Sequence, residues 1–410
     1  MKKIIFFGLQ FYMCSSFAQY TGTASVTQGL ATTIATNLYP CTGGRVCNIG
    51  SIIATDNSVW TVPSAVNFTN NSFPFASDLY NSCTGANYAN ESAALSNLNG
   101  SDIITIDASG EVITAYIFAD NYFEMYINGI AVGKDNVPYT QFNSNIIRFK
   151  VKRPFTIAIL LVDWEENLGV GSENNNGFLY HAGDGGMVAV FKDSNNNTIT
   201  TTGNNWKAQT FYTSPIIDLT CPTEIGTQRL SGNCSTQDSN NGTAYYGLHW
   251  SKPINWMDPA FNDSQWPNAT AYSNTIVGVN NKPAYTNFIN IFDDVTNDAQ
   301  FIWSTNLILD NEVVVRQTVP AVNGIFENKN INREIHIYPN PAKNQFYFDS
   351  NDEIKVEEIK NISIYNTLGV KIFETLKYTN RISFGDIPDG LYFVKISFYN
   401  YQITKKLIVK

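Results

Sequence analysis

The densest group of polar side chains occupies residues 162 to 187, with the sequence VDWEENLGVGSENNNGFLYHAGDGGM. A flat indole ring can stack on the apolar face of a sugar while carboxylates and amides hydrogen-bond its hydroxyl groups. The same oxygens could hold a calcium ion, although nothing in the pattern requires a cofactor. We therefore expect a ligand-binding site here, and the residues assigned to it are Trp164, Glu165, Glu166, Glu173, His181 and Asp184, with Asp163 beside them.

A structural interpretation of the same stretch stays open. Trp164 could end a core strand, Asp163 could cap a turn, and the remaining acids could lie on a solvated loop. The sequence HAGDGG, residues 181 to 186, would then be a glycine turn with a polar tip.

Catalytic patterns are sparse. Two carboxylates at roughly 5 to 10 Å could hydrolyse a glycosidic bond, but adjacent acids such as Glu165 and Glu166 would point to opposite faces of a strand. Of the three His, His336 lies in the terminal unit, which leaves His181 and His249 for acid–base chemistry. No nucleophile elbow, HExxH, phosphate loop, dinucleotide fingerprint or zinc-type spacing occurs. We therefore assign no catalytic or metal-binding residue and favour a non-catalytic protein, with enzymatic activity left uncertain.

The polar stretch follows a segment expected to be a rigid strand, because residues 157 to 162 are apolar on both faces. Loops at the ends of such strands commonly carry function. Just before it, Phe123, Met125 and Ile127 point to one face of a strand and the residues between them to the other. Asn128-Gly129 then supplies a tight hairpin turn, and residue 130 begins the return strand.

From residue 113 to residue 316 the apolar period is two, and turn residues separate the runs. We predict an all-β protein with a large jelly-roll-like β-sandwich over residues 19–316, in which residues 19–100 are loop-rich. Residues 317–334 carry Pro, Gly and Asn without periodicity and are predicted to be a linker.

The chain has 410 residues, too many for one ordinary core, so two folded units are expected. It carries 26 Lys and Arg against 35 Asp and Glu, for a net charge of −9. Nucleic acid is therefore not expected as a partner. Residues 1–18 have two lysines, an apolar run and small residues before Gln19, the pattern of a secretory signal peptide. That run is about half the length needed to cross a bilayer, and no later segment is long enough, so we expect no transmembrane segment.

Five cysteines remain after residue 18. In an exported protein the local disulfide candidates are Cys41 with Cys47 and Cys221 with Cys234, because each pair brackets a turn-rich loop. Cys83 would then be free or would take Cys47 instead. The sequence leaves the pairing open.

Residues 335–410 form a separately patterned unit with short alternating runs and two turn sequences, at residues 366 to 369 and 388 to 390. A unit of this size suffices for a small immunoglobulin-like β-sandwich. Its spaced elements are YPNP, IYNTLG, IPDGLYFVKI and KKLIVK.

These elements, in this order, resemble the type A C-terminal sorting domain of type IX secretion in Bacteroidetes. The resemblance implies passage through the outer membrane by the type IX machinery. The sorting domain is then usually removed, and the remainder is secreted or anchored at the cell surface. The residues that match the family pattern are Pro339, Asn340, Pro341, Gly390, Lys405, Lys406 and Lys410.

Three segments of the large region resemble galactose-binding-like β-sandwich modules. They are FADNYFEMYINGIAVG (118 to 133), FNDSQWPNATAY (261 to 272) and FIWSTNLILDNEVVVR (301 to 316). In those modules the D-S-x-W piece usually precedes the N-G hairpin, whereas here Trp266 follows Asn128. The resemblance therefore supports the fold more than a ligand.

We expect an exported binding or adhesion protein that contacts polysaccharide or another surface glycan. The alternatives are an extracellular glycan-active hydrolase or lyase and a structural surface protein without a ligand. A glycan-binding screen separates the three functions. A binding protein should bind a glycan, an enzyme should convert it, and a structural protein should do neither.

Overall fold

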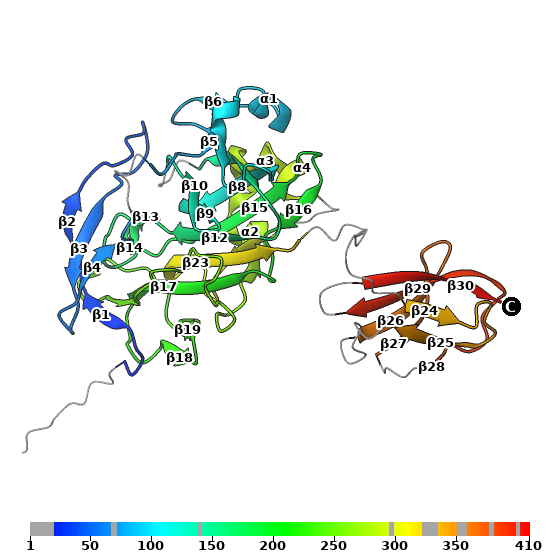
Figure 1. Ribbon diagram of the computed structural model, residues 1–410. Coiled ribbons are helices and arrows are strands. Elements are labelled where there is room, and N and C mark those ends of the chain that lie inside the picture. The colour runs from blue at the N-terminus through cyan, green and yellow to red at the C-terminus, as the bar shows by residue number, and fades with distance from the viewer. Residues whose placement is uncertain are drawn as a thin grey trace, which may run out of the picture. The chain divides into compact units, whose positions relative to one another are not determined.

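The computed structural model describes residues 20–66, 72–137, 142–294, 299–321, 335–350, 359–376, 381–398 and 402–410. The predicted signal peptide, residues 1–18, lies outside these described residues. The chain divides into two compact units, one ending at Ala321 and the other beginning at Val322 (Figure 1). Of the predicted linker, residues 317–319 belong to the last strand of the large unit, and residues 322–334 lie outside the described residues.

Two antiparallel sheets build the large unit. The first, called here the seven-stranded sheet, has the order β1-β20-β17-β23-β12-β9-β10. Its strands are β1 (Ser25–Gln28), β9 (Tyr122–Ile127), β10 (Ile130–Lys134), β12 (Phe155–Val162), β17 (Lys207–Ile216), β20 (Tyr246–His249) and β23 (Asp310–Val319). Figure 1 shows β23 lying between β12 and β17.

The second, nine-stranded sheet has the order β21-β22-β15-β8-β11-β5-β6, with β16 added beside β15 and β7 added parallel to β11. Its strands are β5 (Ser77–Asn81), β6 (Ala86–Asn87), β7 (Ile103–Thr105), β8 (Glu111–Asp120), β11 (Ser144–Val151), β15 (Gly186–Lys192), β16 (Thr198–Thr201), β21 (Thr270–Tyr272) and β22 (Phe301–Trp303).

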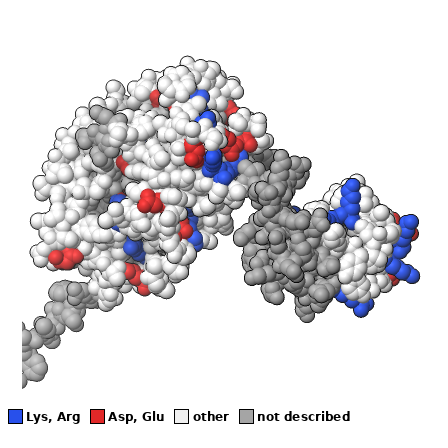
Figure 2. All heavy atoms as spheres, in the orientation of Figure 1, with Lys and Arg blue, Asp and Glu red and all other residues white. Residues whose placement is uncertain are grey.

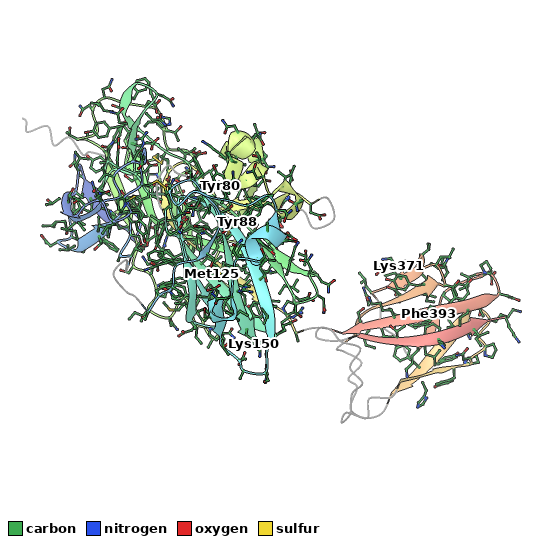
Figure 3. The ribbon with its side chains drawn as sticks, turned by 90° about the horizontal axis from the view of Figure 1, so that it is seen from above. Tyr80, Tyr88, Met125, Lys150, Lys371 and Phe393 are labelled. Atoms are coloured by element: carbon green, nitrogen blue, oxygen red, sulfur yellow. A yellow bond between two sulfur atoms is a disulfide. The ribbon has the colours of Figure 1, made fainter. Side chains whose placement is uncertain are left out.

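The main core lies between the two sheets. Phe123, Met125 and Ile127 of β9 point into it, as their alternation predicted, and Met125 is labelled in Figure 3. The turn at Asn128-Gly129 has positive φ at both residues, 49° and 79°, which explains the Asn-Gly pair. The predicted hairpin is confirmed.

A second core covers the other face of the seven-stranded sheet. Leu160 of β12 and Val314 of β23 pack there against Trp250, Trp256 and Trp266. The covering elements are β2 (Thr32–Ala35), β3 (Ile49–Ile53), β4 (Val59–Val62), the hairpin β13 (Glu173–Asn175) and β14 (Phe178–His181), the hairpin β18 (Thr223–Ile225) and β19 (Gln228–Leu230), and the loop 250 to 268. Because both faces are covered, β12 is completely buried, which confirms the prediction of a central strand.

Helical structure in the described residues is limited to short turns: α1 (Glu91–Leu95), η1 (Gly100–Asp102), α2 (Asn274–Val277), η2 (Val279–Asn281), α3 (Pro283–Thr286) and α4 (Ile289–Phe292). The strand-period prediction missed the helical turns between Ser273 and Asp293. Ser273 caps α2 through its side chain, and Pro283 opens α3, so local start signals outweighed the period. The all-β class is confirmed.

The disulfides correct one prediction. Cys221–Cys234 forms as expected, but Cys41 pairs with Cys83, and Cys47 is a free, buried thiol. Cys47 lies in the second core with Trp164, whereas Cys41 lies against the turn between β5 and β6. The Cα atoms of Cys41 and Cys83 are 5.4 Å apart, inside the range that a disulfide spans.

Arg316 of β23 holds the loop 250 to 268 on the second core. Its Nε donates to Asp263 Oδ2 at 2.8 Å, and its other nitrogens donate to the backbone carbonyls of Trp256 and Asp258. Its guanidinium also lies over the Phe261 ring, 5.1 Å from the centroid. The segments FNDSQW and VVVR, noted in the sequence, thus meet in one buried contact.

The small unit is a separate sandwich with its own core, in which Phe346, Ile364, Val394 and Leu407 are buried. One sheet consists of β24 (Ile335–Tyr338), β25 (Gln345–Ser350) and β28 (Arg381–Ser383). The other has the order β27-β26-β29-β30, with β26 (Ile359–Asn366), β27 (Lys371–Thr375), β29 (Gly390–Phe398) and β30 (Gln402–Val409). Lys371 and Phe393 are labelled in Figure 3. The predicted second β-sandwich is confirmed.

Candidate functional site

Four strand ends meet at one end of the large sandwich. β8 ends at Asp120 in the nine-stranded sheet, and the chain passes through Asn121 into β9 of the seven-stranded sheet. β12 ends beside β9, where the amide of Asn121 donates to the carbonyl of Val162, and β15 begins at Gly186, opposite Asp120. This arrangement brings together five acids, called here the acidic end: Asp120, Asp163, Glu165, Glu173 and Asp184.

Trp164 does not serve as an exposed platform. It is 0% exposed, packs edge-on against Tyr122 with 5.7 Å between ring centroids, and donates through Nε1 to the carbonyl of Asn48 at 3.0 Å. Its backbone amide donates to Asn121 Oδ1 at 2.6 Å. The stacking role suggested by the sequence is therefore wrong for Trp164, because loop residues far away in sequence cover the indole.

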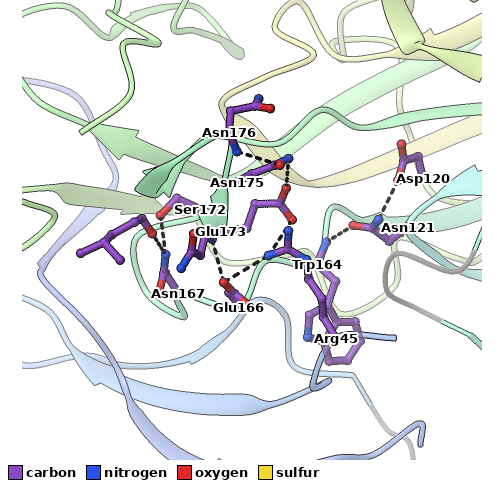
Figure 4. A network of polar contacts seen from close by, with 12 residues as sticks. Arg45, Asp120, Asn121, Trp164, Glu166, Asn167, Ser172, Glu173, Asn175 and Asn176 are labelled. Atoms are coloured by element: carbon purple, nitrogen blue, oxygen red, sulfur yellow. Dashed lines mark hydrogen bonds and ion pairs between the residues drawn. The ribbon is translucent and has the colours of Figure 1, made fainter. Parts of the chain in front are cut away.

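Glu166 and Glu173 are brought together by Arg45, as Figure 4 shows. Arg45 Nη1 lies 3.1 Å from Glu166 Oε1 and 3.5 Å from Glu173 Oε2. Glu166 also accepts the backbone amide of Asn174 at 2.7 Å, and Glu173 accepts the side-chain amide of Asn175 at 2.6 Å. These two acids therefore fasten the β13–β14 hairpin. Nothing in the sequence pointed to Arg45 as their partner.

His181 ends β14, where it is paired with Glu173 across the hairpin. Its Nδ1 lies 2.7 Å from Asp238 Oδ1, an acid that lies 57 residues further along the chain. Asp184 follows three residues later. Burial raises the pKa of Asp184 to about 6, and the Glu173 carboxylate adds to the rise, while His181 and Lys282 oppose it.

Asp163 and Glu165 are the most deeply buried acids of the predicted group, 2% and 3% exposed. Burial raises both pKa values well above the usual range, and neighbouring carboxylates raise them further: Glu165 and Asp184 for Asp163, and Glu173 for Glu165. Both acids approach Gly183, where a Cβ atom would collide with Glu165 Oε1 and lie 3.3 Å from Asp163 Oδ2. Residue 183 is thus a glycine because carboxylate oxygens fill the space beside it.

Asp120 belongs to the same end of the sandwich but was not predicted, since it lies 43 residues before Asp163 in the chain. Burial raises its pKa well above the usual range, and the carboxylates of Asp184 and Asp163 contribute to the rise. The pairing of β8 with β15 could have revealed it only once the strand register was known. Across the part of the chain that the structure describes, no three His, Cys, Asp or Glu side chains are already arranged to hold a metal ion.

A second candidate site, also missed by sequence reasoning, is a hollow of about 320 Å³ beside Phe75. It is lined by residues 38–41, by Phe75, by Cys83 and Thr84, and by Asn136 and Val137. The Phe75 ring is 52% exposed, with the edge of Tyr39 6.0 Å away between centroids. The Cys41–Cys83 disulfide fixes two walls of the hollow to each other. We call this feature the Phe75 hollow.

The polar groups of the Phe75 hollow are held by a network of side chains. Asp78 accepts the Thr84 hydroxyl at 2.9 Å and the Asn136 amide at 3.0 Å. Asn136 Oδ1 in turn accepts from the amides of Asn81 and Asn143. A hydroxyl and an amide are thus kept in fixed positions next to an exposed aromatic ring.

In the small unit, the PNP sequence fastens the last strand. Asn340 Nδ2 donates to the carbonyl of Lys406 at 2.9 Å, and the amide of Ile408 donates to Asn340 Oδ1 at 2.8 Å. The amide of Ala342 also donates to the carbonyl of Ile408 at 2.7 Å. Asn340, between Pro339 and Pro341, therefore continues the hydrogen bonding of β30 at its free edge.

We expect Asn340→Ala to loosen β30. Two side-chain hydrogen bonds are lost, which costs roughly 1 to 3 kcal/mol, so the amides of residues 402–409 should exchange with solvent about tenfold faster or more. Hydrogen-exchange mass spectrometry of the full chain measures this directly. Asn344→Ala is the matched control, because Asn344 is an exposed Asn of the same loop whose recorded hydrogen bond uses its backbone carbonyl. Equal exchange in both variants would contradict the role of Asn340.

The other predicted sorting residues lie on β29 and β30. Gly390 begins β29 opposite Val409, and a Cβ atom there would meet the Tyr392 ring only at 3.6 Å, so the structure gives no steric reason for glycine. On β30, Lys406 is exposed and Lys410 is exposed just beyond the strand, while Lys405 is half-buried on the side of Val394.

Comparison with family models identifies the small unit. Residues 336–410 match the model described as the secretion system C-terminal sorting domain. The small unit is thus a type IX sorting domain, and the chain is directed to the cell surface or the surrounding medium. Among the described residues, no helix has the length and apolar character needed to span a bilayer.

Solved structures give only distant likenesses. Dimeric latent PorU from Porphyromonas gingivalis is 13% identical with a TM-score of 0.15, over 73% of this chain and 30% of that chain. A lectin from Pleurotus ostreatus in complex with GalNAc is 12% identical with a TM-score of 0.16, over 75% of this chain and 74% of that chain. This chain therefore spans less than a third of the PorU chain, and likenesses of this strength carry no argument about function. No curated protein sequence matches the chain.

Proposed function

We propose that this exported chain is a non-catalytic binding protein whose large unit contacts neutral extracellular carbohydrate through the Phe75 hollow. The observation that carries the proposal is the combination of an exposed ring with a fixed amide and hydroxyl in one hollow. The C–H face of a sugar ring is apolar and packs on an aromatic ring. Its hydroxyls can accept a hydrogen bond from the Asn136 amide and donate one to the Thr84 oxygen, whose own proton goes to Asp78.

The size and charge of the hollow support a neutral sugar. About 320 Å³ lies at the lower end of the range of small-ligand pockets, enough for a short saccharide. The lining side chains are uncharged, and the nearby Lys134 is buried with its ammonium 4.7 Å from the Phe75 ring centroid. Figure 2 shows that much of the visible face of the large unit is free of Lys, Arg, Asp and Glu.

The rim of the acidic end is a second candidate contact surface for the same function. Glu166, His181 and Asp238 are partly exposed there, and Phe178 at the start of β14 is exposed beside them. Of the residues predicted from the sequence, Glu166, Glu173, His181 and Asp184 are kept as binding residues in this proposal, whereas the buried Trp164 and Glu165 would act only by supporting the loop.

The proposal is tested by a glycan-binding screen of the purified chain that begins at Gln19. We expect binding to a neutral polysaccharide and about a tenfold weaker Kd for Phe75→Ala, because loss of a half-exposed ring contact costs on the order of 1.5 kcal/mol. Asn136→Ala should weaken binding as well. Ile254→Ala is the matched control, since Ile254 is an exposed apolar residue of another loop.

The remaining outcomes decide between the sites and the functions. Loss of binding in Phe178→Ala but not in Phe75→Ala would show that the carbohydrate binds at the acidic end and not in the Phe75 hollow. Release of shortened sugars by the unmodified chain would support the hydrolase or lyase instead. No binding to any glycan would refute the proposal and favour a structural surface protein.

A further inference from the structure

Two carboxylates at the acidic end point into the same small space. Glu165 Oε1 and Asp163 Oδ2 both face the open side of Gly183, on the loop that joins β14 to β15. The acids themselves follow β12, which belongs to the other sheet. Side chains from one sheet therefore reach the backbone that leads into the other.

Both carboxylates have oxygens without a partner. Asp163 Oδ2 and Glu165 Oε2 are buried and accept no hydrogen bond from the described residues. Arg45 forms ion pairs with Glu166 and Glu173 at this end, and its charge also opposes the rise in the pKa of Glu165. Asp163 and Glu165 hydrogen-bond to each other, and burial raises both pKa values. Buried carboxylates are normally neutralised in this way, paired with a cation or bound to a metal ion, because an isolated buried charge is very costly.

We propose that Asp163 and Glu165 bind a calcium ion beside Gly183. Calcium is a hard cation that takes six to eight oxygen ligands and combines carboxylates with backbone carbonyls and water. It therefore needs no third acidic side chain already in place, in keeping with the absence of such a trio among the described residues. Two carboxylates balance its charge, and carboxylate oxygens suit calcium better than zinc, which prefers nitrogen and sulfur ligands.

Such an ion would join the two sheets at this end of the sandwich. It would connect the segment after β12 to the loop before β15, and Asp120 and Asp184 would add negative potential around it. The site is distinct from the Phe75 hollow, so its test does not depend on carbohydrate binding.

The site is tested by calcium titration of the chain that begins at Gln19, after chelator has removed any bound metal. We expect about one calcium ion per chain by calorimetry. At 100 times Kd we expect a rise of roughly 5 °C in the thermal midpoint of the large unit. Tryptophan fluorescence reports that unit alone, because all seven Trp precede residue 304. Magnesium at the same concentration should give a much smaller shift.

Glu165→Gln should weaken calcium binding at least tenfold while leaving the chelated protein folded, since it removes one of several repelling buried carboxylates. Asp163→Asn gives an independent second variant. Asp218→Asn, which changes an exposed turn acid, should keep the full calcium response. The proposal is overturned if the unmodified chain shows no calcium-specific shift, or if Glu165→Gln and Asp163→Asn respond to calcium like the unmodified chain.

Discussion

Deletion of residues 335–410 should trap the large unit in the periplasm and reduce its delivery to the cell surface to near background. The deleted part carries the complete sorting domain, while the core of the large unit draws on residues before Ala321. The remaining unit should therefore fold without it. Cell fractionation followed by immunoblotting measures the distribution between periplasm, surface and medium.

The control for this deletion is a transfer of the sorting domain together with the residues that precede it. Residues 322–410 fused behind a periplasmic reporter should send that reporter to the surface. Resistance of the trapped large unit to protease shows that retention reflects the missing sorting domain and not misfolding. Normal surface delivery of the truncated chain would disprove the assignment of export to the small unit.

Arg316→Ala should lower the free energy of unfolding of the large unit by about 2 to 4 kcal/mol, because the buried guanidinium leaves its carbonyl acceptors without a donor, while Asp263 itself is partly exposed. The substitution removes the partner of Asp263 and leaves the carbonyls of Trp256 and Asp258 without their donor. It also removes the guanidinium from the Phe261 ring. Denaturant unfolding followed by tryptophan fluorescence is a direct measurement, because Trp250, Trp256 and Trp266 lie in the affected core.

Arg316→Lys is the matched variant. It keeps the positive charge but cannot reproduce the planar fork that reaches three acceptors, so an intermediate loss is expected. Export should be less affected than unfolding, since the sorting domain has a separate core. A loss below about 1 kcal/mol in Arg316→Ala would mean that the loop 250 to 268 is held by its tryptophans and not by Arg316.

The sequence predicted those parts of the fold that depend on neighbouring residues. The hairpin at Asn128-Gly129 follows from the turn requirement for positive φ, and the sorting domain could be read as four short motifs in order. The central position of β12 follows from its apolar faces. The segments that pack over the second core were not predictable, because β2 to β4 and the loop 250 to 268 have no strong periodicity of apolar residues.

The candidate sites show the same division. The acids of residues 163 to 184 stand out in the sequence, but their burial depends on β15 pairing with β8 and on residues near Asn48, contacts between distant segments. The Phe75 hollow combines four separate segments and one disulfide, and the sequence left the partner of Cys41 open. The chemical character of the candidate side chains could thus be predicted from the sequence. Their exposure to solvent could be known only from the fold.

The hydrogen bonds between Asn340 and β30 also bear on which molecules can leave the cell. Leu407 and Val409 fill the core of the sorting domain, and the PNP segment at its start is satisfied only when that strand is present. Residues 402–409 must therefore be synthesised before the sorting domain can fold and be recognised by the export machinery. A chain that stops before residue 402 lacks this strand, and we expect it not to be exported.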